Sequence, residues 1–209
     1  MKFAFCCLVF FGCVSAEFRE EGQVKIVQAH NELRSAVAKG GYNYHKFVNP
    51  PLPQAANMRK LKWNVILARQ AHETANKCGY EPFFQPNFGE NVYAPSSSNP
   101  FKNLDDIGAS AMAEWVDDVS WYTWKSLKIN ENPAKLRRFS QMIRDETSLV
   151  GCGLKDCGKT NGYYKYVVVC KYDPPMSEAD SVVHLQGSPC SNCSAGLTCE
   201  SSSGLCYLY

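Results

Sequence analysis

Cysteine pairing is the strongest constraint that this sequence places on its own fold. The 209-residue chain holds eleven cysteines. Three of them lie in the N-terminal stretch MKFAFCCLVFFGCVSA, where one lysine precedes an apolar run that ends in small residues. This is the pattern of a secretory signal peptide, so we expect residues 1–16 to be removed and the mature chain to be secreted and extracellular.

Eight cysteines then remain, and an even number in an oxidising compartment predicts a framework of disulfide bonds. Spacing alone leaves about 105 pairings open. The CxxC motif near the C-terminus would also suit zinc or redox chemistry, but in a secreted segment rich in serine and glycine it favours a structural role. The eight are Cys78, Cys152, Cys157, Cys170, Cys190, Cys193, Cys199 and Cys206.

Helices precede strands in the predicted order of elements. Hydrophobic residues at helical spacing predict helices over 23–39 and over 61–78. A third helix is expected over 105–124, because it begins with an acidic pair suited to a helix N-terminus. The stretch RRFSQMIR at 137–144 combines three arginines with an apolar stripe and predicts a shorter helix.

Two apolar runs late in the chain, 149–154 and 163–172, are joined by a glycine-containing turn and predict an antiparallel hairpin. Helices followed by a sheet indicate an α+β fold rather than parallel βαβ units. Towards the C-terminus the composition becomes polar and small. We therefore expect a main domain over 17–176 and a cysteine-rich tail over 177–209 that two disulfides hold together.

Charge and motifs argue against several functional classes. The formal net charge is +2 without a basic tract, which argues against a nucleic-acid partner. The chain lacks a run of about 18 apolar residues, so no stable membrane span is expected. It has no GxSxG or HExxH motif, and its mature cysteines are expected to be paired, so we expect no enzymatic activity and no cofactor.

Five segments in order carry a resemblance to a known family: AHNELR, GENVYA, EWVDDV, RRFSQMI running on to VGCG, and VVVCKYDP. Together with the cysteines they resemble the CAP superfamily. The tail PCSNC…C…GLC is most similar to the venom allergen-like, activation-associated secreted proteins of parasitic nematodes. The resemblance implies a three-layer α-β-α sandwich. It also implies the disulfides Cys78–Cys152, Cys157–Cys170, Cys190–Cys199 and Cys193–Cys206.

The resemblance further implies a central cavity in which two histidines and two acidic residues hold a divalent cation such as zinc. The acids are present as Glu90 and Asp118, but one histidine position falls near Pro82 and the other is Arg138. A guanidinium stays protonated and cannot ligate a metal, so we expect a metal-independent protein. Our hypothesis is that Arg138 forms a salt bridge with Glu90, Asp118 or both, the alternative being that it points to solvent. The remaining histidines are expected to be packing or surface residues: His30, His45, His72 and His184.

Aromatic side chains crowd the loop YEPFFQPNFGENVY. A cluster of this kind indicates a binding surface if it is exposed, although the rings would equally serve as core if they seal the cavity. The resemblance implies binding of cholesterol or another sterol through this loop, and of fatty acids in a groove between helices. The candidate lipid-binding residues are Tyr80, Phe83, Phe84, Phe88 and Tyr93.

The sequence thus favours a secreted CAP protein that binds sterols and fatty acids, released by a parasite to act on its host. The alternative is a secreted immunomodulator that contacts a host receptor protein and has no lipid role. The irregular segments 42–58 and 94–104 are available for such contacts, but nothing in their chemistry names a partner.

Overall fold

The computed structural model of this chain describes residues 18–42, 52–79, 89–120, 124–132, 134–176 and 182–208. Several predictions concern residues outside these ranges: those for the signal peptide, His45, Tyr80, Phe83, Phe84 and Phe88. Within the described ranges, no helix is both long enough and apolar enough to cross a membrane.

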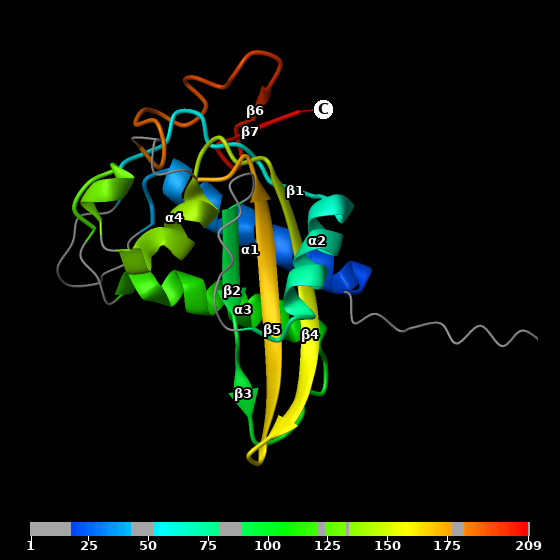
Figure 1. The fold of residues 1–209 in the computed structure, drawn as a ribbon. Helices are drawn as coiled ribbons and strands as arrows, with labels where there is room; N and C mark the ends of the chain where they lie inside the picture. Colours follow the sequence, from blue (N-terminus) through cyan, green and yellow to red (C-terminus); the bar gives the residue numbers. More distant parts are fainter. Residues whose placement is uncertain are drawn as a thin grey trace, which may run out of the picture.

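A long hairpin forms the centre of the main sheet (Figure 1). Its two strands are antiparallel, and their turn contains Asn161 and Gly162, both with positive φ, as tight hairpin turns require. The strand order is β1-β4-β5-β2, with β3 also beside β5 and with β1 parallel to β4. The predicted hairpin is therefore confirmed. The strands are β1 (Lys62–Trp63), β2 (Gly89–Tyr93), β3 (Ser96–Ser97), β4 (Leu149–Thr160) and β5 (Tyr163–Asp173).

Helices cover both faces of this sheet (Figure 1). Successive residues of a strand point to opposite faces, and β5 shows this alternation. Val167 and Val169 pack with residues of α2, whereas Val168 and Tyr172 belong to the larger core that includes α1, α3 and α4. The α+β architecture with helical layers on both sides of a sheet is thus established. The helices are α1 (Glu20–Ala38), α2 (Val65–Ala75), α3 (Asp105–Asp117) and α4 (Arg137–Ile143), with short 3₁₀ turns η1 (Asp118–Ser120), η2 (Ile129–Glu131) and η3 (Ala134–Leu136).

Helix α2 begins later than its hydrophobic spacing predicts. Asn64 caps it, because its side-chain oxygen accepts hydrogen bonds from the backbone N–H groups of Ile66 and Leu67 at 2.9 Å each. The helix then lies directly on β4, where Gly151 and Gly153 leave no room for a Cβ next to the α2 backbone. These two glycines of the VGCG segment therefore set how closely helix and sheet approach.

Two of the four disulfides differ from those that the resemblance implied. Cys152 is bonded to Cys170, which lies directly opposite it in the β4–β5 register with Cα atoms 4.1 Å apart. Cys157 is bonded to Cys78, just beyond the end of α2. Cys157 lies five residues beyond Cys152 on β4, which is about 16 Å at the rise of a strand, so it is not opposite Cys170. The implied pairings Cys78–Cys152 and Cys157–Cys170 were therefore wrong.

The tail folds back onto the end of the main domain rather than standing apart from it. Its hairpin consists of β6 (Thr198–Glu200) and β7 (Leu205–Tyr207), and the structure confirms its predicted bonds Cys190–Cys199 and Cys193–Cys206. Backbone hydrogen bonds join Cys206 to Met58 and Lys60 on the main domain. The tail is therefore positioned to form part of a site that also contains α1 and β1.

Candidate functional site

Asp118, one of the two acids implied by the resemblance, has an arginine as its partner. Arg138 Nε donates to Asp118 Oδ2 at 2.8 Å, and Nη2 donates to Asp118 Oδ1 at 2.6 Å. Asp118 lies just after α3 and Arg138 lies in the first turn of α4, so the bond ties these two helices together. The hypothesis named Glu90, Asp118 or both as partners of Arg138, and the structure brings it to Asp118.

The second acid, Glu90, faces a lysine. Lys171 Nζ lies 2.6 Å from Glu90 Oε2, and the two side chains are only 4% and 3% exposed. They are cross-strand neighbours, because Glu90 on β2 is in register with Lys171 on β5. Two buried charges of opposite sign stabilise each other only while both are present, so removing either one alone is expected to cost about 3–5 kcal/mol.

A chain of hydrogen bonds links this site to α1. Asn91, next to Glu90, donates from Nδ2 to the backbone oxygen of Arg138 at 3.0 Å and also lies 3.4 Å from the Tyr172 hydroxyl. His30 Nδ1 donates to the backbone oxygen of Ile26 at 2.8 Å, since a carbonyl can only accept. His30 Nε2 therefore accepts from the Tyr172 hydroxyl at 2.9 Å.

Burial keeps this network uncharged. It lowers the pKa of His30 to about 4, because a charged imidazole would lose its hydration in the core. It also raises the pKa of the Tyr172 hydroxyl above its usual value. His30 is thus the packed core histidine that the sequence predicted rather than a metal ligand.

A second core residue, Arg34, holds the chain that follows α4. All five of its N–H groups donate to backbone carbonyls at 2.8–3.2 Å. Burial lowers the pKa of its guanidinium to about 9. Because Arg34 fixes the segment between α4 and β4, it positions the helix that carries Arg138. The acceptors are the carbonyls of Arg59, Met142, Arg144, Asp145 and Thr147.

Two further histidines lie away from the acids in the fold. His184 donates from Nε2 to the backbone oxygen of Pro53 at 3.0 Å, and burial lowers its pKa to about 4. His72 lies on α2, where its backbone contacts Gly153 on the opposite face of the sheet from α1. His30 and His184 are therefore packing residues, and His72 lies on α2 away from the acids; the sequence predicted packing or surface roles for all three.

Of the five candidate lipid-binding aromatics, the structure describes Tyr93. It lies at the end of β2, half-buried against the large core, and burial raises the pKa of its hydroxyl. This packing favours a structural role for Tyr93. Tyr80, Phe83, Phe84 and Phe88 remain outside the described ranges, so their predicted roles remain predictions.

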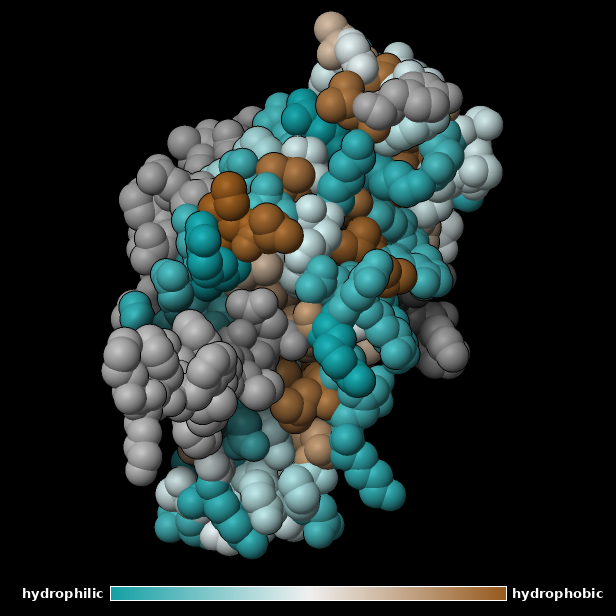
Figure 2. Space-filling view, turned by 90° about the vertical axis from the view of Figure 1, so that its right-hand side faces the viewer, coloured by the Kyte–Doolittle hydropathy of each residue, from teal (hydrophilic) through white to brown (hydrophobic). Residues whose placement is uncertain are grey.

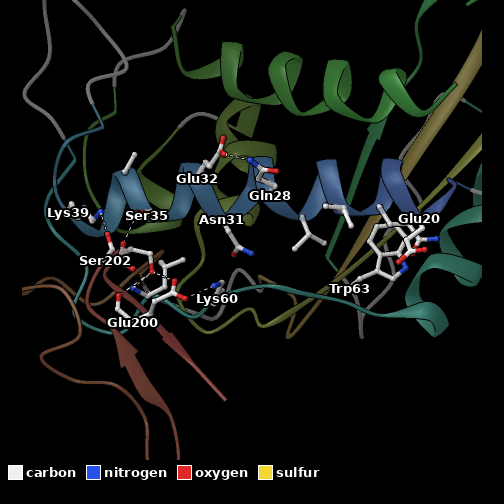
Figure 3. Close-up of a pocket in the computed structure, with 16 residues that line it drawn as sticks. Glu20, Gln28, Asn31, Glu32, Ser35, Lys39, Lys60, Trp63, Glu200 and Ser202 are labelled. Atoms are coloured by element: carbon white, nitrogen blue, oxygen red, sulfur yellow. Dashed lines mark hydrogen bonds and ion pairs between the residues drawn. The ribbon is translucent and has the colours of Figure 1, made fainter. Parts of the chain in front are cut away.

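An open groove of about 930 Å³ runs along the outer side of α1. Figure 3 shows α1 along its length, Lys39, Ser202 and Glu200 at one end, and Trp63 with Glu20 at the other. The resemblance implied a groove between helices, but this one is bounded by α1, the segment around β1 and the tail. Apolar side chains that line it include Val24, Val27, Trp63 and Leu205.

Exposed apolar residues continue beyond the groove at the Trp63 end. Val24 of the groove is 58% exposed, and outside the groove Val65 and Ile66 in the first turn of α2 are 73% and 53% exposed. Figure 2 shows clusters of hydrophobic residues among polar ones on the face formed by α2 and the N-terminal end of α1. Apolar side chains exposed together on one face, such as Val65 and Ile66, are candidates for a contact surface.

Comparison with protein-family models decides the classification. Residues 27–172 match the model of the cysteine-rich secretory protein family, CAP. The chain belongs to the CAP family. The match spans α1 to β5 and therefore includes both acids, Arg138 and Lys171, whereas the tail lies beyond it.

Individual CAP relatives agree with this classification. Venom allergen 5 of Microctonus hyperodae is 31% identical over 76% of this chain and 68% of its own length. Ancylostoma secreted protein of Ancylostoma caninum is 30% identical over 86% of this chain, which spans only 42% of that relative. A crystal structure of NaASP2 with Zn²⁺ has 26% identity and a TM-score of 0.79 and covers 93% of this chain and 100% of its own.

The donor set of this chain does not suit the cation that the CAP fold implies. Glu90 and Asp118 are present, but each is already ion-paired, Glu90 with Lys171 and Asp118 with Arg138, and neither cation can ligate a metal. Among the described residues, one group of three metal-type ligands lies close together, Cys190, Cys193 and Cys206, and these are all in disulfides. Lys171 and Arg138 thus pair with the two carboxylates that a metal would need as ligands.

The sequence reasoning missed Lys171 and Arg34. Pairing GENVY antiparallel with YVVVCKY would have placed Glu90 opposite Lys171, so the signal was present in the predicted sheet. For Arg34 the only signal was a charged residue on the apolar side of α1, at helical spacing with Ile26, His30 and Val37. Such a residue needs many acceptors if it is buried.

Proposed function

We propose that this chain is a secreted, non-catalytic CAP protein that binds sterols and fatty acids and that a parasite releases to act on its host. The observation that carries the proposal is the groove of about 930 Å³ along α1, which is within the size range of small-molecule sites. The internal ion pairs at Glu90 and Asp118 support a binding role that does not depend on a metal.

The sterol part of the proposal rests on the aromatic loop. Binding of radiolabelled cholesterol to the secreted mature chain tests it directly, with Phe83, Phe84 and Phe88 changed together to Ala. Tyr163→Ala is a matched control, since Tyr163 is an exposed aromatic at the far tip of the β4–β5 hairpin (Figure 1). We expect a loss of cholesterol binding in the triple variant and none in the control. Equal binding by the unsubstituted chain, the triple variant and the control would contradict the loop assignment.

A second candidate is contact with a host receptor protein, and the exposed pair Val65 and Ile66 favours it. Changing both to Ser removes the apolar surface but leaves the Asn64 cap and the groove lining intact. If protein contact is the function, this variant loses binding to host cells while its lipid affinity is unchanged. If lipid carriage is the function instead, the effect on host cells is lost only in variants that lose cholesterol or fatty-acid binding.

A further inference from the structure

We propose that the cysteine-rich tail is a site of thiol–disulfide exchange, at which a low-molecular-weight thiol converts the observed disulfides into an alternative pair. In the alternative form the two cysteines of the CxxC motif are bonded to each other, and so are the two cysteines of the β6–β7 hairpin. The chain neither gains nor loses a disulfide, and the exchange is independent of what the groove along α1 binds. The observed bonds are Cys190–Cys199 and Cys193–Cys206, and the alternative bonds are Cys190–Cys193 and Cys199–Cys206.

The two disulfides of the tail lie close enough together to exchange partners. The sulfur atoms of Cys190, Cys193 and Cys206 all lie within 4.8 Å of one another, although Cys190 is bonded to neither of the other two. Exchange proceeds by attack of a thiolate on a disulfide sulfur, so a Cys190 thiolate needs only a small side-chain movement to reach the other bond. Among the described residues this is the only such group of three sulfur atoms.

The strand register favours the alternative bond in the hairpin. Cys199 on β6 and Cys206 on β7 lie directly opposite each other. The same chain already has a disulfide between two directly opposite strand residues, Cys152 and Cys170, whose Cα atoms are 4.1 Å apart. A bond between Cys199 and Cys206 therefore has a counterpart elsewhere in the fold.

The CxxC motif is folded as a turn. The backbone N–H of Ser191 donates to the backbone oxygen of Ser188 at 3.0 Å, and the turn brings the sulfur atoms of Cys190 and Cys193 within 4.8 Å. A bond between these two cysteines closes a loop that is already formed. CxxC is also the motif of proteins that exchange disulfides.

Cys199 is the entry point for an external thiol, because it is exposed whereas Cys206 is only 1% exposed. A thiolate that attacks Cys199 Sγ forms a mixed disulfide and releases the Cys190 thiolate. That thiolate attacks Cys193 Sγ, forms the CxxC bond and releases the Cys206 thiolate. The Cys206 thiolate then attacks Cys199 Sγ and releases the external thiol, which is recovered unchanged.

A cation stabilises the thiolate that leaves the second disulfide. Arg59 forms a β-bridge with Cys206, and its guanidinium donates at 3.1 Å to the hydroxyl of Ser194, the residue after Cys193. Arg59 Nε is buried and has no hydrogen-bond acceptor among the described residues. An arginine beside a cysteine stabilises its thiolate form, so Arg59 promotes the release of Cys206.

Exchange changes how the tail is held on the main domain. The bond between Cys193 and Cys206 joins two segments that dock separately on the chain before β1. One docks through the Asn192 N–H, which donates to the Ala56 oxygen at 3.0 Å. The other docks through the Cys206 N–H, which donates to the Met58 oxygen at 2.8 Å. In the alternative form no disulfide joins these two segments, so the Cys206 amide loses protection against hydrogen exchange.

The test uses the mature chain with its native cysteines. It is incubated with less glutathione than protein, and free thiols are then blocked with N-ethylmaleimide. Digestion with chymotrypsin and Glu-C, after Leu197 and Glu200, separates Cys199 from the CxxC segment and from Cys206. Mass spectrometry then gives three linked peptides for the observed form. The alternative form gives a CxxC peptide with an internal bond and a separate Cys199 peptide linked to a Cys206 peptide.

We expect more chains to change their pairing than there are glutathione molecules, because each glutathione is released at the end of the cycle. The bonds Cys78–Cys157 and Cys152–Cys170 should stay as observed, since no third sulfur of the described residues lies beside them. Simple reduction of the tail would instead consume glutathione stoichiometrically and yield chains with blocked cysteines. Either that result or an unchanged tail would overturn the inference.

Two double variants test the halves of the alternative form separately. Cys199→Ser with Cys206→Ser leaves the CxxC pair in the tail, and Cys190→Ser with Cys193→Ser leaves the hairpin pair. We expect thiol titration of each secreted variant to find no free thiol. Free thiols in either variant would show that the corresponding alternative bond does not form and would overturn the inference, and the measurement on the native chain decides the matter if a variant is not secreted.

The role of Arg59 has a rate as its readout. Arg59→Gln should slow the exchange several-fold without changing which cysteines pair. Arg69→Gln changes an exposed arginine on α2 and is the matched control, so it should leave the rate as it is. Equal rates in the wild-type chain and in Arg59→Gln would overturn the assignment of Arg59 as the stabilising cation.

Discussion

Arg138 and Asp118 form a bidentate ion pair: two N–H groups of the guanidinium donate to the two oxygens of one carboxylate, at 2.8 and 2.6 Å. The Arg138 side chain is 34% exposed and the Asp118 side chain 12%. The pair is therefore only partly desolvated, unlike the buried Glu90–Lys171 pair.

We expect Arg138→Met to lower the free energy of unfolding at pH 7 by about 1–2 kcal/mol, because Asp118 loses its partner. A double-mutant cycle with Asp118→Asn should give a coupling energy of about 1 kcal/mol or more. Arg69→Met, which changes an exposed arginine on α2, is the control. Urea unfolding provides the measurement, and additive effects of the two substitutions would show that the contact contributes nothing.

Arg34 should matter more than any other single arginine of α1 and α4. Arg34→Met removes five hydrogen bonds to backbone carbonyls, although those of Arg144 and Asp145 keep backbone N–H donors. We expect the free energy of unfolding to fall by more than about 3 kcal/mol, and Arg34→Lys to recover only part of this loss because an ammonium has fewer donors. The measurement is thermal unfolding of the secreted variants. A change below about 1 kcal/mol for Arg34→Met would mean that water replaces the guanidinium.

The two buried histidines predict a loss of stability in mild acid. Burial lowers the pKa of both His30 and His184 from 6.5 to about 4. Below pH 6.5 the unfolded chain binds protons at both sites and the folded chain does not, so the free energy of unfolding falls as the pH decreases from 6.5 to 4. At 1.36 kcal/mol for each pKa unit, the loss is about 3 kcal/mol for each histidine.

Urea unfolding at pH 7, 5.5 and 4.5 measures this dependence, and His184→Gln should remove about half of it. A variant as acid-sensitive as the wild-type chain would show that His184 does not titrate as its burial predicts.

The disulfide pattern is directly measurable. Trypsin cleaves after Lys155 and so separates Cys152 from Cys157; a digest without reduction should then yield Cys78 linked to Cys157 and Cys152 linked to Cys170. The Cys78–Cys157 bond spans 79 residues, so removing both cysteines should cost about 4 kcal/mol on loop entropy alone. Recovery of Cys78 linked to Cys152 would contradict the structure.

Local patterns predicted much of this fold, but long-range register did not follow from them. The helical spacing of α1 and the β-branched run of β5 were sufficient to place these elements. The pairing of Cys170 depended on which residue of β4 lies opposite it, and a register shift between Asp156 and Lys159 is invisible in the sequence.

The site was predictable only in part for the same reason. Because Arg138 stands at a position where the resemblance implies a histidine beside two acids, its ion pair with an acid could be predicted from opposite charge. The acceptors of Arg34 are backbone carbonyls 25 to 113 residues away, so its role emerges only once the chain has folded. The groove likewise depends on the tail docking against α1, which no local pattern encodes.

The most direct test of the central claim is the analysis of what co-purifies with the secreted mature chain. Native mass spectrometry, lipid extraction and metal analysis are applied to one sample after dialysis against EDTA. The account predicts a retained lipid at up to one per chain and no stoichiometric metal. A chain that carries one zinc ion and no extractable lipid, and that takes up neither cholesterol nor hexadecanoate when these are added, would contradict it.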